Sequence, residues 1–211
     1  LFAKYRAIII DDLEAGFFSQ EQQNLIDQFV AMRGGTVLML GGQESFQQGG
    51  WENTPVGRIL PIYLDQTSKG GPALEATYDL TREGRLEDWM RLRAGQEEED
   101  IRLAYMPPFF AVNQIAAIKP GASVLATVTD SEQRYGEGKT AAVAVGDIWR
   151  WAMKDAEQQA EAGKMWRQLL RWAVTDVAAR VEVEKEERSE GAIPMTKVSV
   201  RVRDQAYAPQ D

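Results

Sequence analysis

Near the start of the chain, two short apolar runs flank an amphipathic segment. The runs at 7–10 and 36–40 are apolar and rich in β-branched residues, which predicts strands buried on both faces of a parallel sheet. Between them, Ser19 and Gln22 have the spacing of a helix capping box, and Gly34 supplies a left-handed residue that ends a helix. The pattern therefore predicts a right-handed βαβ unit.

The middle of the chain has a less regular pattern. A polar, Gly-rich loop at 41–50 precedes a short helix that ends near Pro61, and the acidic run at 97–100 predicts a solvated loop. The remaining short strands are predicted at 74–80, 101–105, 123–128 and 140–145. A turn around Gly136 and Gly138 separates the last two, and the strands at 101–105, 123–128 and 140–145 are together expected to form an antiparallel section at one side of the sheet.

The last third of the chain changes from a helical to an alternating pattern. Apolar residues recur at helical spacing between 155 and 177, which predicts the helix that closes the domain. Valines then alternate with polar residues at positions 181, 183, 198, 200 and 202. Two such strands do not form a stable domain alone. The pattern predicts an α/β domain at 1–178 and a β extension, or the start of a following β module, at 179–211.

Composition narrows the function further. The 211 residues include no Cys and no His, and the formal net charge is -8. The missing Cys excludes disulfides and thiolate metal sites without deciding between a reducing and an oxidising compartment. No basic face appears along the chain, so nucleic acid is not an expected partner. No apolar run is long enough for direct membrane insertion. Because the first residue is not Met, we expect an excerpt of a longer polypeptide.

Several ordered motifs resemble a known family. They lie at Tyr5 to Asp12, Glu21-Gln22, Arg33 to Gly42, Ser45-Phe46, Gly49 to Trp51, Thr54-Pro55, Leu60-Pro61, Gly146 to Trp151 and Leu169 to Trp172. Together they resemble the class I glutamine-amidotransferase-like domain of large bacterial envelope-associated proteins, which often accompanies von Willebrand type A modules. The resemblance covers most of 5–178.

The resemblance implies a fold, a setting and a set of partners. The fold is a flavodoxin-like three-layer sandwich with a mainly parallel sheet, in which the family's strand and helix before Ala7 are missing. The implied location is periplasmic or membrane-associated, as part of a larger protein. The implied partners are other domains of that protein or other envelope proteins, and no cofactor is expected.

The chain departs from true amidotransferases at the catalytic turn. In the family, the nucleophilic Cys follows a strand equivalent to 36–40, whereas this chain has Gly41, Gly42, Gln43 and Glu44 there. Ser45 follows, but its neighbours do not form a small-x-Ser-x-small nucleophile turn, and the chain has no His to activate a hydroxyl. Glutamine hydrolysis is therefore not expected.

Two groups of residues are candidates for ligand binding. Asp11 and Asp12 end one predicted strand, and the turn from Gly41 to Ser45 follows another. If these two strands are adjacent, the carboxylates of Asp11, Asp12 and Glu44 gather near one crevice, where they would suit Mg²⁺ or Ca²⁺ or bind a cationic group. Alternatively, one aspartate caps a turn and Glu44 is solvated. Arg150 lies between two Trp residues, where it would hold an anion between aromatic walls or pair with an acid while both rings pack in the core.

Three functions follow from these patterns. The first is a non-catalytic binding or scaffold domain within a larger protein. The second is a carboxylate- or metal-dependent hydrolase with its site at the carboxyl ends of the strands that end at Asp12 and Leu40. The third is recognition of a sugar or another small molecule through Trp51, Trp149 and Trp151.

Overall fold

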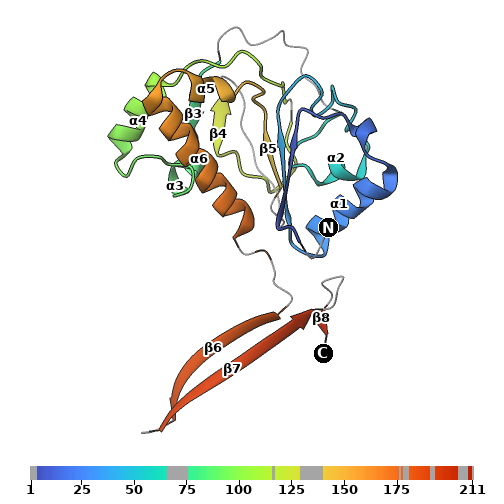
Figure 1. The fold of residues 1–211 in the computed structure, drawn as a ribbon, viewed down its shortest axis with the longest axis vertical. Helices are drawn as coiled ribbons and strands as arrows, with labels where there is room; N and C mark the ends of the chain where they lie inside the picture. Colours follow the sequence, from blue (N-terminus) through green and yellow to red (C-terminus); the bar gives the residue numbers. More distant parts are fainter. Residues whose placement is uncertain are drawn as a thin grey trace.

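An α/β unit and a C-terminal β-hairpin make up the part of the chain that the structure describes (Figure 1). The structure is a computed structural model and describes residues 4–65, 76–115, 117–128, 140–175, 177, 181–190, 193–203 and 209–210. The central parallel sheet has the order β1-β2-β5, and its strands are β1 (Ala7–Asp11), β2 (Thr36–Leu40) and β5 (Thr140–Val143).

The predicted βαβ unit is confirmed. Helix α1 (Gln20–Ala31) begins at Ser19, whose hydroxyl accepts a hydrogen bond from the Gln22 N–H while the Gln22 side chain accepts one from the Ser19 N–H. Gly34 has a φ of 68°, so the chain leaves the helix in the left-handed conformation that glycine adopts without strain. β2 then returns parallel to β1, with Ala7 beside Thr36 and Asp11 beside Leu40.

Both faces of the sheet are covered by helices, which makes a flavodoxin-like three-layer sandwich. Val37 and Met39 pack in one cluster with α1 and the short helix α2 (Pro55–Ile59). Leu38 and Leu40 point to the opposite face, where they pack against Leu169 of α6 (Ala156–Val174). All five residues of β2 are buried, as expected for a central strand, and each fully buried Leu contributes roughly 2 kcal/mol.

The predicted antiparallel section at the side of the sheet is wrong. β5 pairs parallel to β2 and belongs to the central sheet. The predicted strand at 123–128 is reduced to β4 (Ala126–Val128), which pairs antiparallel with β3 (Tyr78–Leu80) in a separate two-stranded sheet. Residues 74–75 of the predicted strand at 74–80, and the turn glycines Gly136 and Gly138, lie outside the described residues. Strand order depends on contacts between distant segments, which local pattern does not encode.

The predicted loop at 97–100 and strand at 101–105 are both wrong, because one helix contains them. Helix α4 (Gln96–Tyr105) has three glutamates in its first turn, where negative charge favours the helix dipole. Glu99, Arg102 and Leu103 are buried on one face of it. The short helix α3 (Arg82–Leu86) precedes α4 and is capped by the Thr81 hydroxyl.

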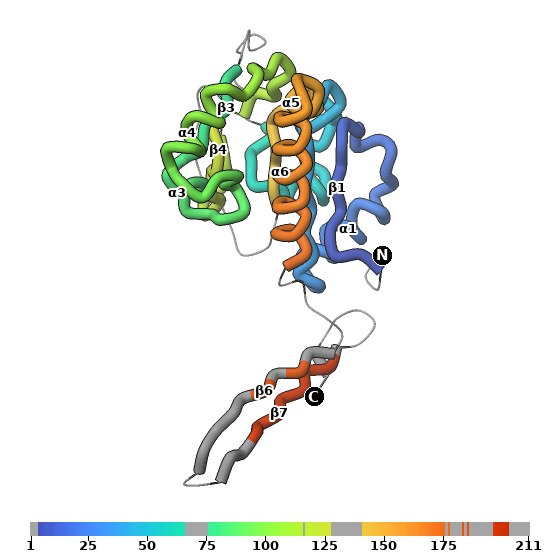
Figure 2. Tube along the Cα trace, turned by 60° about the vertical axis from the view of Figure 1, so that its left-hand side comes forward, coloured from blue at the N-terminus to red at the C-terminus, as the bar shows by residue number. Residues whose placement is uncertain are grey.

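Two helices close the α/β unit. Helix α5 (Trp149–Met153) leads into α6, whose N-terminus is capped by the Asp155 side chain through the Gln158 N–H at 2.8 Å. Trp172 near the end of α6 stacks on Trp89, with ring centroids 4.6 Å apart. Figure 2 shows α6 between the α3–α4 region and the β1–α1 region.

The predicted alternation of valines produces a hairpin. β6 (Val181–Glu190) pairs antiparallel with β7 (Ile193–Arg203), which places Val181 beside Val202 and Val183 beside Val200. A short β8 (Pro209–Gln210) adds to β7. Among the described residues, no helix combines the length and the hydrophobicity needed to span a bilayer.

Candidate functional site

Three loops meet at the carboxyl edge of the parallel sheet. The register places Asp11 of β1 beside Leu40 of β2, and Leu40 beside Val143 of β5. Ligands of open α/β sheets bind at this edge, because the loops that follow the strands converge there. The loops after β1 and β2 are therefore neighbours, which meets the condition that the sequence left open.

Asp12 holds the loop after β2 in place. Its Oδ1 accepts a hydrogen bond of 2.7 Å from the backbone N–H of Glu44, so the carboxylate caps the turn. The backbone of Asp12 has a φ of 45°, a left-handed conformation that Asp tolerates better than most residues. A Cβ atom on Gly42 would lie 2.1 Å from Asp12 Oδ1, so the turn accepts only glycine in this arrangement. Asp11 is exposed at the end of β1.

The two glycines of the turn also pack against the loop after β5. A Cβ atom on Gly41 would lie 2.8 Å from the backbone of Ala144 and Val145. Asn113 fixes the turn through two hydrogen bonds, because its Oδ1 accepts from Gly42 N at 2.9 Å and its Nδ2 donates to Gly42 O at 2.8 Å. The sequence reasoning missed Asn113, since its segment is irregular and its partner is 71 positions away.

The remaining turn residues have separate environments. The Ser45 side chain is buried, and its Oγ donates to the Leu40 carbonyl at 2.7 Å. This hydroxyl is committed to the backbone, and the chain contains no His that would deprotonate it. Gln43 and Glu44 point into solvent. The buried polar groups of the turn are thus used for internal hydrogen bonds.

Arg150 lies at the same edge, beyond β5. The buried Asp147 carboxylate accepts hydrogen bonds from the backbone N–H groups of Phe110 and Ala111, and it lies 3.6 Å from Arg150 Nε. The Arg150 guanidinium lies 4.6 Å from the Phe110 ring centroid and 6.0 Å from that of Trp149. A guanidinium over ring faces gains cation–π energy and keeps donors for an anion.

The three tryptophans predicted to recognise a small molecule do not share a surface. Trp149 is 57% exposed, whereas Trp51 and Trp151 are buried in different clusters. The Trp51 indole donates to the Leu13 carbonyl at 2.8 Å. Recognition through all three rings is therefore wrong, and Phe110 replaces Trp151 as the second ring beside Arg150.

The carboxylates predicted for a metal site do not form one. Across the residues that the structure describes, no group of three or more acidic, His or Cys side chains lies close enough to hold a metal ion. Asp12 is engaged with the turn, while Asp11 and Glu44 are exposed. The interpretation in which an aspartate caps the turn and Glu44 is solvated agrees with this geometry.

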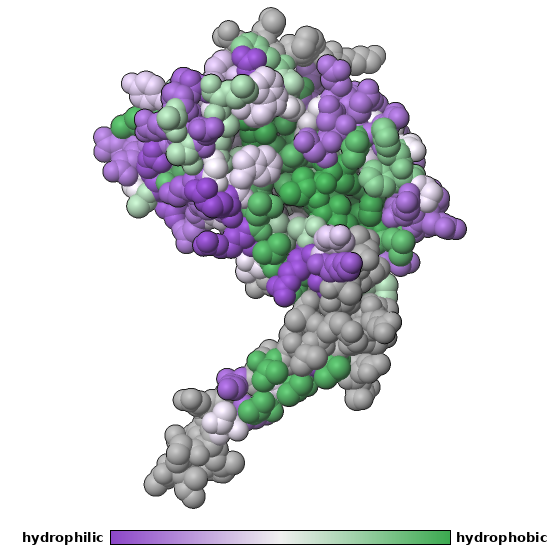
Figure 3. All heavy atoms as spheres, viewed as in Figure 1, coloured by the Kyte–Doolittle hydropathy of each residue, from purple (hydrophilic) through white to green (hydrophobic). Residues whose placement is uncertain are grey.

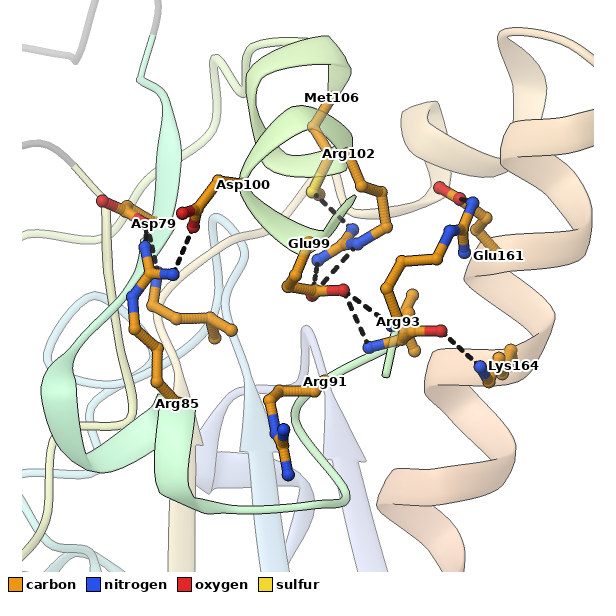
Figure 4. Close-up of polar contacts among 12 residues, drawn as sticks. Asp79, Arg85, Arg91, Arg93, Glu99, Asp100, Arg102, Met106, Glu161 and Lys164 are labelled. Carbon is orange, nitrogen blue, oxygen red and sulfur yellow. Dashed lines mark hydrogen bonds and ion pairs between the residues drawn. The ribbon is translucent and has the colours of Figure 1, made fainter. Parts of the chain in front are cut away.

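A second set of ionisable groups lies away from the sheet edge, under α4 (Figure 4). Its centre is Glu99, which is only 1% exposed. One carboxylate oxygen accepts from the N–H groups of Leu92 and Arg93 at 3.1 and 2.8 Å, and the other pairs with Arg102 at 2.5 Å. Because every oxygen of the buried carboxylate has a partner, this Glu99 cluster joins α4 to the segment at 87–95.

The same cluster extends to α6 and to the small sheet. The Arg93 guanidinium pairs with Glu161 of α6, and Lys164 donates to the Leu92 carbonyl (Figure 4). Burial raises the pKa of the Tyr78 phenol of β3 well above its ordinary value; Arg102 opposes this rise in pKa and Glu99 adds to it. The only local sequence signal was the spacing of Glu99 and Arg102, which places both on one side of a helix. The Glu99 cluster thus holds α4, the segment at 87–95 and α6 together.

The comparisons with known proteins find similarity in fold. No family model matches the chain, and no curated protein matches it in sequence. Two solved structures from Salmonella typhimurium are similar in fold: Cytoplasmic Protein STM3548 has a TM-score of 0.58 at 20% identity, and Cytoplasmic Protein STM1381 has 0.60 at 21%. Each match covers 81% of this chain, and 72% and 73% of the two neighbours. At this identity, the likeness supports the α/β fold alone.

The names of these two neighbours also correct one expectation. Both proteins are called cytoplasmic, which contradicts the periplasmic or membrane-associated location implied by the family resemblance. That expectation came from the larger proteins in which domains of this kind occur, and not from any residue of the chain.

Proposed function

We propose that residues 1–178 are an amidotransferase-like domain without a reactive centre, which works as a binding or scaffold module within a larger protein. One observation carries the proposal: the Ser45 hydroxyl of the turn at 41–45 and the neighbouring Asp12 carboxylate are both used to hold the turn. The Asp12 carboxylate and the Ser45 hydroxyl both bind backbone groups. A nucleophile at this turn would need an exposed reactive atom and a neighbouring base.

The binding surface that this proposal favours is the edge around Arg150. The guanidinium lies near the rings of Phe110 and Trp149, both of which are exposed, while Asp147 fixes its orientation from below. A planar guanidinium with flanking rings suits a carboxylate on a flexible segment. We therefore assign to this surface an acidic segment of another domain of the same protein.

Two measurements test the proposal. Pure protein incubated with glutamine is expected to release no ammonia, and release above a heat-denatured control would contradict the loss of catalysis. A peptide of glutamate residues is then titrated into the protein while Trp fluorescence reports on the exposed Trp149. Arg150→Ala is expected to abolish the change, and Arg171→Ala on the exposed side of α6 is the matched control. Equal binding by both variants would remove the surface from the proposal.

The hydrolase alternative is tested separately. Calorimetry with Mg²⁺, Ca²⁺ and Mn²⁺ at millimolar concentration should give no heat of binding, and the melting temperature should not rise. A ligand that binds the folded state at about 100 times its Kd would stabilise it by about 2.7 kcal/mol, which is easily measured. Metal binding lost in Asp11→Asn would instead support a carboxylate site at this edge.

A further inference from the structure

The outer edge of β1 is open in the part of the chain that the structure describes. There, β1 pairs with β2 along one edge, and no described strand pairs with the other. An open edge presents a row of backbone N–H and C=O groups that favour another strand. The edge carries neither a proline nor an internal charge between Ala7 and Ile10, so it lacks the usual features that prevent pairing.

The face of β1 toward α6 is open as well. Ile8 and Ile10 belong to the cluster under α1, so Ile9 points to the opposite face by the alternation of a strand. Ile9 is 41% exposed, although its neighbour Leu38 on β2 is buried under α6. The view of this face in Figure 3 shows apolar atoms over the strands beside α6. Helix α6 thus covers β2 and β5 and leaves β1 apolar and accessible.

The two ends of this strand carry opposite charge. Lys4 and Arg6 precede the apolar run, Asp11 and Asp12 follow it, and all four side chains are exposed. A parallel copy of the strand would place like charges side by side. An antiparallel copy would place each basic end beside an acidic end, which is the complementarity that favours specific pairing.

We infer that this edge is a self-complementary interface for a second copy of the chain. The two β1 strands pair antiparallel about a two-fold axis at Ile9, so that Ile9 lies beside the Ile9 of the other copy. In this register Arg6 lies opposite Asp12 and Ile8 opposite Ile10, with each residue on the face it already occupies. The two sheets become continuous, and both exposed Ile9 side chains are covered.

The first test uses the absence of cysteine. Ile9→Cys introduces a single thiol at the two-fold axis, where opposite Cα atoms of an antiparallel pair lie about 4.5–5.5 Å apart, within the range of a disulfide. Mild oxidant is expected to give a covalent dimer rapidly. Leu86→Cys, at a 75% exposed position on α3, is the matched control. Crosslinking of the Ile9→Cys protein no faster than that of the control would overturn the inference.

The second test uses charge, in the chain without the crosslink. Lys4→Glu with Arg6→Glu makes both ends acidic, and Asp11→Lys makes the acidic end less so. Each variant alone is expected to sediment as a monomer at concentrations where the wild type dimerises, and an equal mixture of the two is expected to recover the dimer. Asp12 is kept because it caps the turn.

Circular dichroism first confirms that each variant of the β1 edge is folded. A wild type that stays monomeric from about 1 μM to about 1 mM overturns the inference, since that range includes the weak interfaces of signalling and transient complexes. A dimer that is unaffected by the charge reversals also overturns it, because the copies would then meet through another surface, such as the β6–β7 hairpin.

Discussion

Asp12 at the sheet edge and Glu99 in α4 are both carboxylates that accept hydrogen bonds from backbone N–H groups, but their surroundings differ. Asp12 is exposed and binds one N–H group of a turn. Glu99 is buried, binds two N–H groups and pairs with the buried Arg102. Water can replace a lost partner at the edge, but not under α4. Asp12, which the sequence selected as a candidate ligand-binding residue, is therefore expected to contribute less to the stability of the fold than Glu99.

The largest expected effect tests this difference at Glu99. Glu99→Ala leaves the Arg102 charge buried without its partner and two backbone N–H groups without an acceptor, so we expect a loss of about 3–5 kcal/mol in the free energy of unfolding. Urea denaturation followed by circular dichroism measures it. The neighbouring Glu98→Ala, at an exposed position of the same helix, should change stability by less than about 0.5 kcal/mol. Equal losses would break the comparison.

Gly42→Ala tests the edge. The new Cβ would lie 2.1 Å from Asp12 Oδ1, so the Asp12 side chain must move and we expect a cost of about 1–3 kcal/mol. Asp12→Gly in the same protein removes the obstacle and suits the φ of 45° at that position, so the double variant should recover part of the loss. Gly16→Ala, where no atom lies within 4 Å of the new Cβ, is the control. Additive losses would show that Asp12 does not contact the turn.

Alkaline pH tests whether the Tyr78 phenol is buried beside the Glu99 cluster. Because the folded pKa of Tyr78 is raised above its ordinary value of 10.0, the unfolded chain loses this proton first as the pH rises. The free energy of unfolding should therefore be unaffected by Tyr78 below pH 10 and fall by about 1.4 kcal/mol per pH unit above it. Urea titrations between about pH 9 and pH 11, with Tyr78→Phe as the reference, isolate this contribution. An identical slope in both proteins would contradict the burial of the phenol.

The smallest stability effect is expected at Arg150. Its ion pair with Asp147 is partly exposed, so Arg150→Ala should cost no more than about 1 kcal/mol. The same change should abolish peptide binding if the surface acts as proposed. A large loss of stability with unchanged peptide binding would show that Arg150 has a structural role and not the binding role assigned to it. Thermal melts and the fluorescence titration on one preparation measure both quantities.

The parts of the fold that the sequence predicted correctly are those specified by local signals. The capping box at Ser19, the left-handed Gly34 and the buried run at 36–40 act within a few residues of themselves, and the βαβ unit follows from them. The helix at 96–105 was missed because its acidic first turn was interpreted as a solvated run. Three glutamates at a helix N-terminus are also what the helix dipole favours.

The candidate site was predictable only in position. Asp11, Asp12 and the turn at 41–45 lie at one edge because parallel strands end together, which the pattern of apolar runs already implied. The hydrogen bonds of Asn113 to Gly42 and the burial of Glu99 depend on segments 71 and 7 positions away, whose packing no local pattern contains. Burial decides how much a carboxylate contributes to stability, and burial is a property of the folded molecule.

The stack of Trp89 on Trp172 gives the molecule an internal optical reporter. Two indole rings stacked with centroids 4.6 Å apart can couple their electronic transitions, so we expect docking of the segment at 87–95 onto α6 to give a separate circular dichroism band. Gln168 of α6 donates to the carbonyls of the same segment. If α4 and this segment detach from α6 as a unit before the sheet unfolds, the coupled band will disappear while the helical signal persists.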